Sequence, residues 1–179
     1  MFQIKLLRPF CFFLSIFMFG CASSVKLHDD VPKLQRLVTQ ENPLSDMTVV
    51  MTPEAEKKFD EGGKGFSIDK LLVVLRQRLE EKQLLNPKLT NGRVAEIVIT
   101  DIRIRNAAAA VMVGFLSGAD TVSGDLLIYR QDRTKEAGLG FSYSMALGGL
   151  SMADQERRFN FMYNGLADKL ESALVGTSD

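Results

Sequence analysis

The chain has almost none of the residues that most often carry metal-dependent or nucleophilic chemistry. Its 179 residues include one histidine, two cysteines and no tryptophan. A zinc site needs several histidine, cysteine or carboxylate ligands together, and a serine or cysteine nucleophile needs a nearby histidine base. With His28 as the only histidine, we expect no bound metal, no cofactor and no catalytic residues.

Neither an excess of charge nor a long apolar run is present. The 22 basic and 22 acidic residues cancel to a formal net charge of +0, which gives no electrostatic case for nucleic-acid binding. The apolar run from Phe10 to Phe19 holds about ten residues, whereas a transmembrane helix needs about 20. We therefore expect no nucleic-acid partner and no membrane-spanning helix.

The N-terminus is typical of a bacterial secretory signal, because two basic residues precede the apolar run. The tetrapeptide Met-Phe-Gly-Cys at 18–21 resembles the lipobox of bacterial lipoproteins, in which the final cysteine receives diacylglycerol. Gly20 and Cys21 match that pattern, and the two residues before them differ from it. The other interpretation is ordinary cleavage after Ala22.

The cysteine count favours the lipoprotein interpretation. Cys11 would leave with the signal, so the mature chain would keep Cys21 alone, without an intramolecular disulfide partner. A free thiol is reactive in an oxidising compartment, whereas an acylated cysteine is not. We therefore predict a signal peptide at residues 1–20 and a lipid on Cys21. Ala22 follows in place of the aspartate that commonly retains lipoproteins at the inner membrane, so the resemblance implies the periplasmic face of the outer membrane.

The mature chain is predicted to consist of a tether and one domain. Residues 21–46 are polar with sparse hydrophobic residues, which is typical of a lipidated N-terminus followed by a flexible tether. Without the signal, 179 − 20 = 159 residues remain, a length that builds one hydrophobic core without a disulfide or a metal. We assign residues 47–176 to a single domain.

Apolar periodicity predicts that this domain belongs to the α+β class. Alternating or short apolar runs indicate strands, and apolar residues at steps of three and four indicate two helices. The predicted order is strand 47–51, helix 67–85, strands 93–105, 120–130 and 139–147, and helix 151–174. This order favours a mostly antiparallel four-stranded sheet with both helices on one face, and leaves open a parallel crossover between the first two strands.

Two of the predicted strands have faces of different character. At 101–105 the alternation places Ile102 and Ile104 inward and the charged residues Asp101, Arg103 and Arg105 outward, as a solvated face or as an anion site. The last strand places large side chains on one face and glycine, serine and alanine on the other. We expect the large face to meet the helices.

The stretch 107–119 contains no charged residue and has two interpretations. It is either a buried loop or strand that crosses the core, with glycines where the backbone turns, or an exposed apolar surface that contacts a partner protein or a second copy of the chain. The candidate contact residues are Val111, Val113, Gly114, Phe115, Leu116 and Gly118.

Several short motifs resemble one family of small Gram-negative envelope lipoproteins. These motifs are Ile-Thr-Asp-Ile-Arg-Ile-Arg at 99–105, Gly114 with the Gly-Ala-Asp strand start at 118–120, and the Asp-Arg-Thr turn at 132–134. Over residues 47–174 they resemble domain of unknown function 4410, and more distantly the lipoproteins of secretion-channel assembly or of cell-wall synthase activation. The resemblance implies an envelope lipoprotein without an assigned activity.

These observations predict a lipid-anchored protein with a non-enzymatic accessory, structural or partner-binding role. The alternative is an oligomeric subunit of an envelope secretion or cell-wall machine, which would need the self-contact at 107–119. An envelope hydrolase would need a convergent polar site. The acids that the predicted sheet brings near one another are better explained as surface residues. They are Glu96, Asp101, Asp120 and Asp125.

Overall fold

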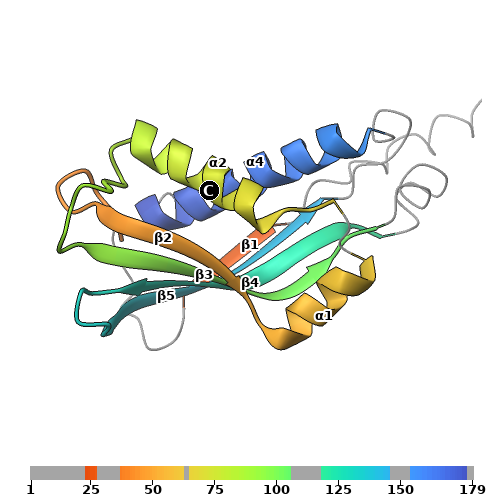
Figure 1. Cartoon of the computed structure of the whole chain (residues 1–179), viewed down its shortest axis with the longest axis horizontal. Helices are drawn as coiled ribbons and strands as arrows, with labels where there is room; N and C mark the ends of the chain where they lie inside the picture. Colours follow the sequence, from red (N-terminus) through yellow and green to blue (C-terminus); the bar gives the residue numbers. More distant parts are fainter. Residues whose placement is uncertain (1–22, 28–36, 63–64, 106–117, 146–153, 177–179) are drawn as a thin grey trace, which may run out of the picture.

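Within the described residues, five strands form one mixed sheet and two helices cover one of its faces (Figure 1). The structure, a computed structural model, describes residues 23–27, 37–62, 65–105, 118–145 and 154–176. Along the chain the elements are β1 (Ser23–Leu27), β2 (Leu44–Met51), α1 (Pro53–Gly62), α2 (Ile68–Glu81), β3 (Arg93–Arg103), β4 (Asp120–Tyr129), β5 (Lys135–Met145) and α4 (Gln155–Val175). Across the sheet the strand order is β1-β5-β4-β3-β2.

The predicted α+β class and order of elements are confirmed from β2 to α4. β3, β4 and β5 pair antiparallel with one another, whereas β2 pairs parallel to β3. Parallel neighbours cannot be joined by a tight turn, so the chain runs through α1 and α2 before it returns as β3. The crossover that the sequence left open is therefore present, and the sheet is mostly antiparallel.

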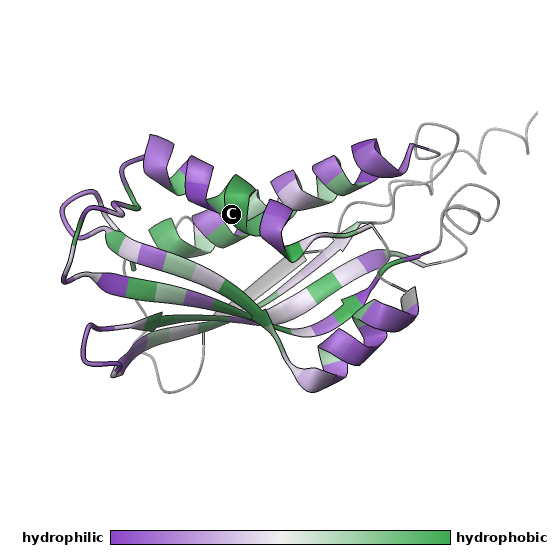
Figure 2. Cartoon of the chain, viewed as in Figure 1, coloured by the Kyte–Doolittle hydropathy of each residue, from purple (hydrophilic) through white to green (hydrophobic). Residues whose placement is uncertain are grey.

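The hydrophobic core lies between the sheet and the helices α2 and α4. Alternate residues of β4 are buried, including Val122, Leu126 and Ile128, and so are Ile102 and Ile104 at the end of β3. Figure 2 shows the hydrophobic faces of these elements turned toward one another. The predicted helix stripes are buried as well, which follows from their spacing of three and four residues. The buried members are Leu71, Leu75, Leu79, Phe159, Met162, Leu166, Leu170 and Leu174.

α4 packs closely on the large face of β5, as the sequence predicted. Tyr143 and Met145 are buried beneath the helix, whereas the small residues between them lie on the other face of the strand. A Cβ atom on Gly165 would lie 2.1 Å from the Tyr143 hydroxyl oxygen. Glycine is about 1 kcal/mol less favourable than alanine inside a helix. At position 165 it is nevertheless required, because a side chain there would clash with Tyr143.

The segment predicted to be a tether contributes to the fold in two places. β1 pairs antiparallel with β5 as an additional edge strand, which the four-stranded prediction lacked. Leu37 and Val38 donate their backbone N–H groups to the carbonyl oxygen of Leu174, at 2.9 and 3.0 Å, and Val38 and Leu44 are fully buried. The folded unit therefore begins before residue 47. Composition gave no sign of this because an edge strand can pair through its main chain alone.

Two helix assignments also differ from the prediction. α1 occupies a stretch for which the sequence analysis predicted no helix, and it lies on the sheet face opposite α2 and α4 (Figure 1). Its surface is mostly charged, with Ala55 buried and Phe59 packed against the core. α4 begins at Gln155 and not near 151, because Asp154 is extended and caps the helix by accepting hydrogen bonds from the next turn. Among the described residues, no helix is long and apolar enough to span a membrane.

Candidate functional site

Most residues proposed for the anchor and the contact surface lie outside the described residues. This applies to Cys21 and to the candidates between 111 and 116. Gly118 is described, and its φ of +84° is a left-handed conformation that favours glycine. Its carbonyl oxygen accepts a hydrogen bond of 2.9 Å from Nη1 of Arg105. The structure thus describes the residues from which the 106–117 segment departs and to which it returns.

The three charged residues at the end of β3 do not converge into an anion site. Asp101 pairs with Lys58 of α1, and Arg103 is exposed. Arg105 departs from the expected solvated face, because only 6% of it is exposed. β3 ends at Arg103, so the strand alternation no longer determines where Arg105 lies.

Arg105 instead belongs to a buried charge cluster that Asp120 and Arg158 complete. Asp120 is fully buried, and Arg158 is 1% exposed. Arg158 donates from Nε to Oδ2 of Asp120 at 2.9 Å and from Nη2 to Oδ1 at 2.7 Å. Arg105 donates to the same carboxylate from its backbone N–H at 2.8 Å and from its guanidinium at 3.3 and 3.4 Å. We call Arg105, Asp120 and Arg158 the Asp120 cluster.

The Asp120 cluster connects the ends of four elements at one end of the sheet. Arg105 follows β3, Asp120 begins β4, and Arg158 belongs to the first turn of α4. Arg158 also donates from Nη2 to the Arg105 carbonyl oxygen at 2.6 Å. In the β4–β5 ladder Asp120 is the register partner of Met145, the last residue of β5. The cluster therefore lies where the chain leaves for the segments 106–117 and 146–153.

The chemistry available to the Asp120 cluster is structural. Both carboxylate oxygens of Asp120 accept hydrogen bonds from buried guanidinium groups, so neither oxygen is left to contact a substrate. Burying these charges is costly, and the cost is offset only while all partners are present. The cluster is thus suited to fixing the geometry of this end of the domain.

The sequence does indicate that Arg158 is buried, although the search for apolar periodicity passed over it because it is charged. Arg158 lies four and eight residues before Met162 and Leu166, so it occupies the buried stripe of α4. A charged residue on an apolar stripe requires a buried partner. Asp120 at the start of a hydrophobic strand is the matching residue, but no local pattern connects two positions so far apart in the sequence.

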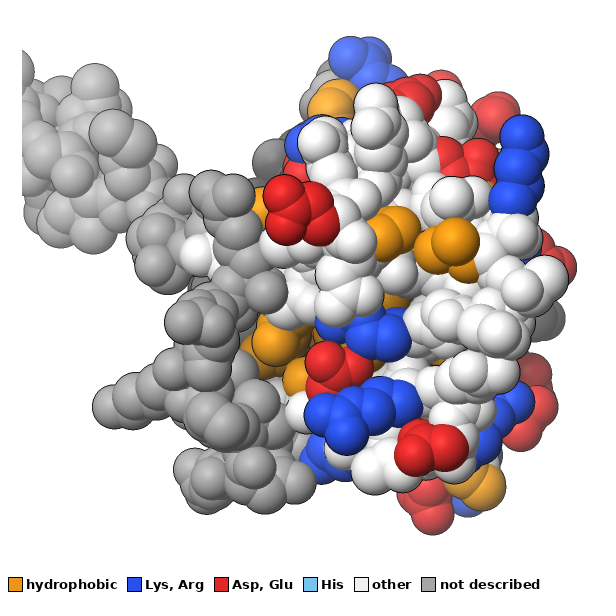
Figure 3. Space-filling model, turned by 90° about the vertical axis from the view of Figure 1, so that its left-hand side faces the viewer, with side chains coloured by type: hydrophobic (Ala, Val, Ile, Leu, Met, Phe, Trp, Pro, Cys, Tyr) orange, Lys and Arg blue, Asp and Glu red, His pale blue; other side chains and the backbone are white. Residues whose placement is uncertain are grey.

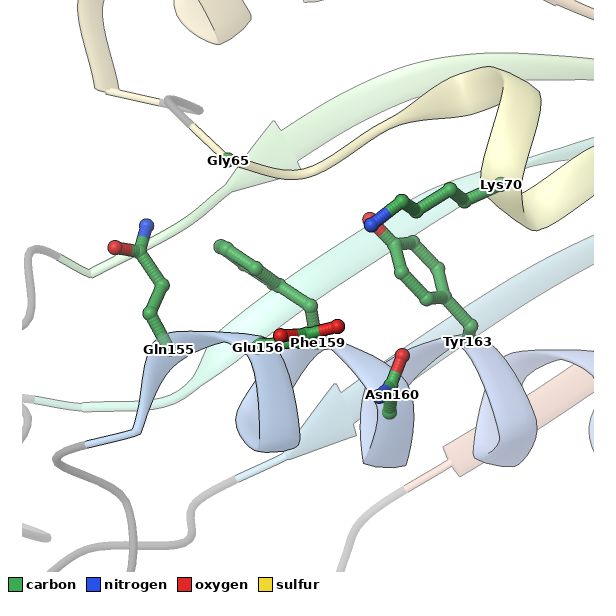
Figure 4. A pocket seen from close by; sticks show the side chains of 7 residues that line it. All are labelled: Gly65, Lys70, Gln155, Glu156, Phe159, Asn160 and Tyr163. Atoms are coloured by element: carbon green, nitrogen blue, oxygen red, sulfur yellow. The ribbon is translucent and has the colours of Figure 1, made fainter.

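A cleft of about 520 Å³ lies beside the N-terminal half of α4, the half that also contains Arg158. Phe159 and Tyr163 point from α4 toward the segment that leads into α2, and Lys70 extends from α2 (Figure 4). The Tyr163 hydroxyl oxygen accepts a hydrogen bond of 2.7 Å from the backbone N–H of Ser67, the N-cap of α2. Burial raises the pKa of Tyr163, and the hydrogen bond from Ser67 partly offsets this increase. The remaining polar residues of the cleft, including Glu156, lie on its exposed rim.

The described residues offer no metal site. No three histidine, cysteine, aspartate or glutamate side chains come together among them in a way that could hold a metal ion. Two of the acids named in the sequence analysis also have different basic partners. Asp120 is neutralised by arginine, and Asp101 pairs with Lys58.

Comparisons with known proteins give only distant structural likenesses. No family model matches the chain, and no curated protein matches it in sequence. Two structures of the PelC dodecamer from Paraburkholderia phytofirmans, one of them a variant, show such a likeness. The variant shows a TM-score of 0.45 and 13% identity over 88% of this chain and 100% of its own. The other shows a TM-score of 0.47 and 12% identity over 86% and 98%. A crystal structure described as an uncharacterized protein has a TM-score of 0.45 at 13% identity, over 81% of this chain and 97% of its own.

The Asp120 cluster makes a stability prediction with a matched control. Asp120→Asn keeps the size of the side chain but leaves two buried arginines without a carboxylate, so we expect a loss of about 3 to 5 kcal/mol in the free energy of unfolding. Asp101→Asn removes an acid from an exposed pair and should cost less than about 1 kcal/mol. Urea denaturation followed by circular dichroism measures both. Similar small losses in the two variants would show that the cluster does not hold this end of the domain.

Proposed function

We propose that this chain is a lipid-anchored protein of the bacterial envelope, at the periplasmic face of the outer membrane, with an accessory or partner-binding role and no catalytic one. The observation that carries the proposal is the Asp120 cluster. Three buried charges are used to fix the geometry of one end of the domain. A domain end of fixed geometry suits the binding of a partner, and no reaction needs to be assumed.

The charges of the described residues support a binding role over a catalytic one. Acid–base catalysis needs a titratable group that can reach a substrate, and the most deeply buried acid, Asp120, has both oxygens occupied by arginine. The cleft beside α4 has an aromatic floor, formed by Phe159 and Tyr163, and an exposed polar rim. Such a lining suits the contact of a side chain or a small molecule more than activation of a nucleophile.

The lipid anchor is tested at Cys21. Cells expressing the full chain and grown with radiolabelled palmitate should incorporate label into the wild-type protein and not into Cys21→Ser, because the acylated cysteine is the site of attachment. Membrane fractionation of both proteins gives an independent readout. Equal labelling of the two proteins, or a mature N-terminus at Ser23 found by mass spectrometry, would refute the anchor.

A second candidate function is that of an oligomeric subunit in an envelope secretion or cell-wall machine. Neither 106–117 nor 146–153 contains a charged residue. The ends of both segments are brought together by the Asp120 cluster, through Arg105 and Gly118 on one side and the start of α4 on the other. Uncharged segments whose flanking residues meet favour contact with another protein surface or a second copy of the chain. The candidate contact residues remain Val111, Val113, Gly114, Phe115, Leu116 and Gly118.

Charge substitutions separate a contact surface from a buried loop. If the segment is a contact surface, Val113→Glu and Phe115→Glu should abolish association while changing the free energy of unfolding by less than about 0.5 kcal/mol. Val73→Glu makes the same change at a position of α2 that is 62% exposed and should change neither quantity. Light scattering and thermal melts measure the two effects. A monomeric wild type together with strongly destabilised Val113→Glu and Phe115→Glu would exclude the assembly role.

A further inference from the structure

The pairing of β1 determines where the N-terminal anchor meets the domain. In the antiparallel ladder Ser23 is the register partner of Tyr143, and Leu27 is the partner of Leu139. β1 therefore begins beside the end of β5. Cys21 is two residues before Ser23, and two residues of extended chain span at most about 7 Å.

This end of the sheet is also the end that the Asp120 cluster organises. Tyr143 lies two residues before the end of β5 at Met145, whose register partner in β4 is Asp120. The first turn of α4 lies here as well, because Arg158 bonds to Asp120. The start of β1, the ends of β3 and β5 and the starts of β4 and α4 therefore share one end of the domain (Figure 1).

The β4–β5 hairpin lies at the opposite end of the domain. Tyr143 lies eight positions after Lys135, which corresponds to about 27 Å along β5. Beyond Lys135 the β4–β5 hairpin exposes Arg130, Asp132 and Arg133. Figure 3, which faces this end, shows basic and acidic side chains interspersed on the surface.

We propose that the Asp120-cluster end of the domain rests directly on a lipid surface, because β1 starts beside this end and Cys21 is only two residues before β1. The inference rests on the proposed lipidation of Cys21. In this geometry a short link between Cys21 and β1 takes the place of a long flexible tether. The hairpin that carries Arg130 and Asp132 then points away from the membrane. The alternative geometry has β1 unpaired. The next residue held in the fold is then Leu37, and sixteen residues of extended chain would let the domain move roughly 55 Å from the membrane.

The inference is tested on the full, lipidated chain with one fluorescent probe at a time. An introduced cysteine is the only free thiol of the mature protein when Cys21 is acylated, so Glu156→Cys and Gln131→Cys are labelled singly. Both positions are exposed, Glu156 at the start of α4 and Gln131 in the hairpin. Each labelled protein is reconstituted into vesicles of phosphatidylethanolamine and phosphatidylglycerol that carry a spin-labelled headgroup, which quenches nearby fluorophores.

We expect the Glu156 probe to be quenched several-fold more strongly than the Gln131 probe. Insertion of about ten glycine and serine residues between Ala22 and Ser23 should abolish this difference, because the anchor no longer fixes the domain. Equal quenching at the two positions of the uninserted chain, or stronger quenching at Gln131, would overturn the inference while palmitate on Cys21 still supported the anchor. Loss of palmitate labelling would overturn the proposed function, and the inference with it.

Discussion

The carboxylate of Asp120 accepts hydrogen bonds from two buried arginines that come from different parts of the chain. Arg105 follows β3, and Arg158 lies in the first turn of α4, 38 residues beyond Asp120. All three side chains are almost completely buried, so each charge depends on the other two. The positions of the strand ends and of the helix start are consequently linked through one side chain.

The two ends of the sheet differ in how the chain passes from one element to the next. At one end, the buried charges fix the ends of β3 and β5 and the starts of β4 and α4, and the segments that leave it are uncharged in sequence. At the other end, a tight hairpin exposes charged side chains. The hydrogen bonds that Asp132 accepts from Thr134 lower the pKa of Asp132, which keeps that turn charged. The proposed anchor, through β1, belongs to the first end.

Sequence periodicity predicted the parts of the fold that repeat along one element. The stripes of α2 and α4, the inward residues of β4 and the large face of β5 were found because burial recurs every two residues in a strand and every three or four in a helix. β1 was missed because an edge strand pairs through its main chain, and α1 because its surface is mostly charged. The Asp120 cluster was missed because its charges lie far apart in sequence and meet only in the folded chain. A charged residue on an apolar helix stripe, such as Arg158, is the feature that would have revealed it.

The amide hydrogen of Arg105 reports most directly on the central role of Asp120, since it is donated to the carboxylate at 2.8 Å outside any strand ladder. Its exchange with solvent deuterium can be followed by nuclear magnetic resonance and compared with the amides of Ile97, inside β3, and Arg133, in the hairpin. If the cluster fixes this end of the domain, the Arg105 amide should exchange as slowly as that of Ile97, through global unfolding. Exchange as rapid as that of Arg133 would contradict the account.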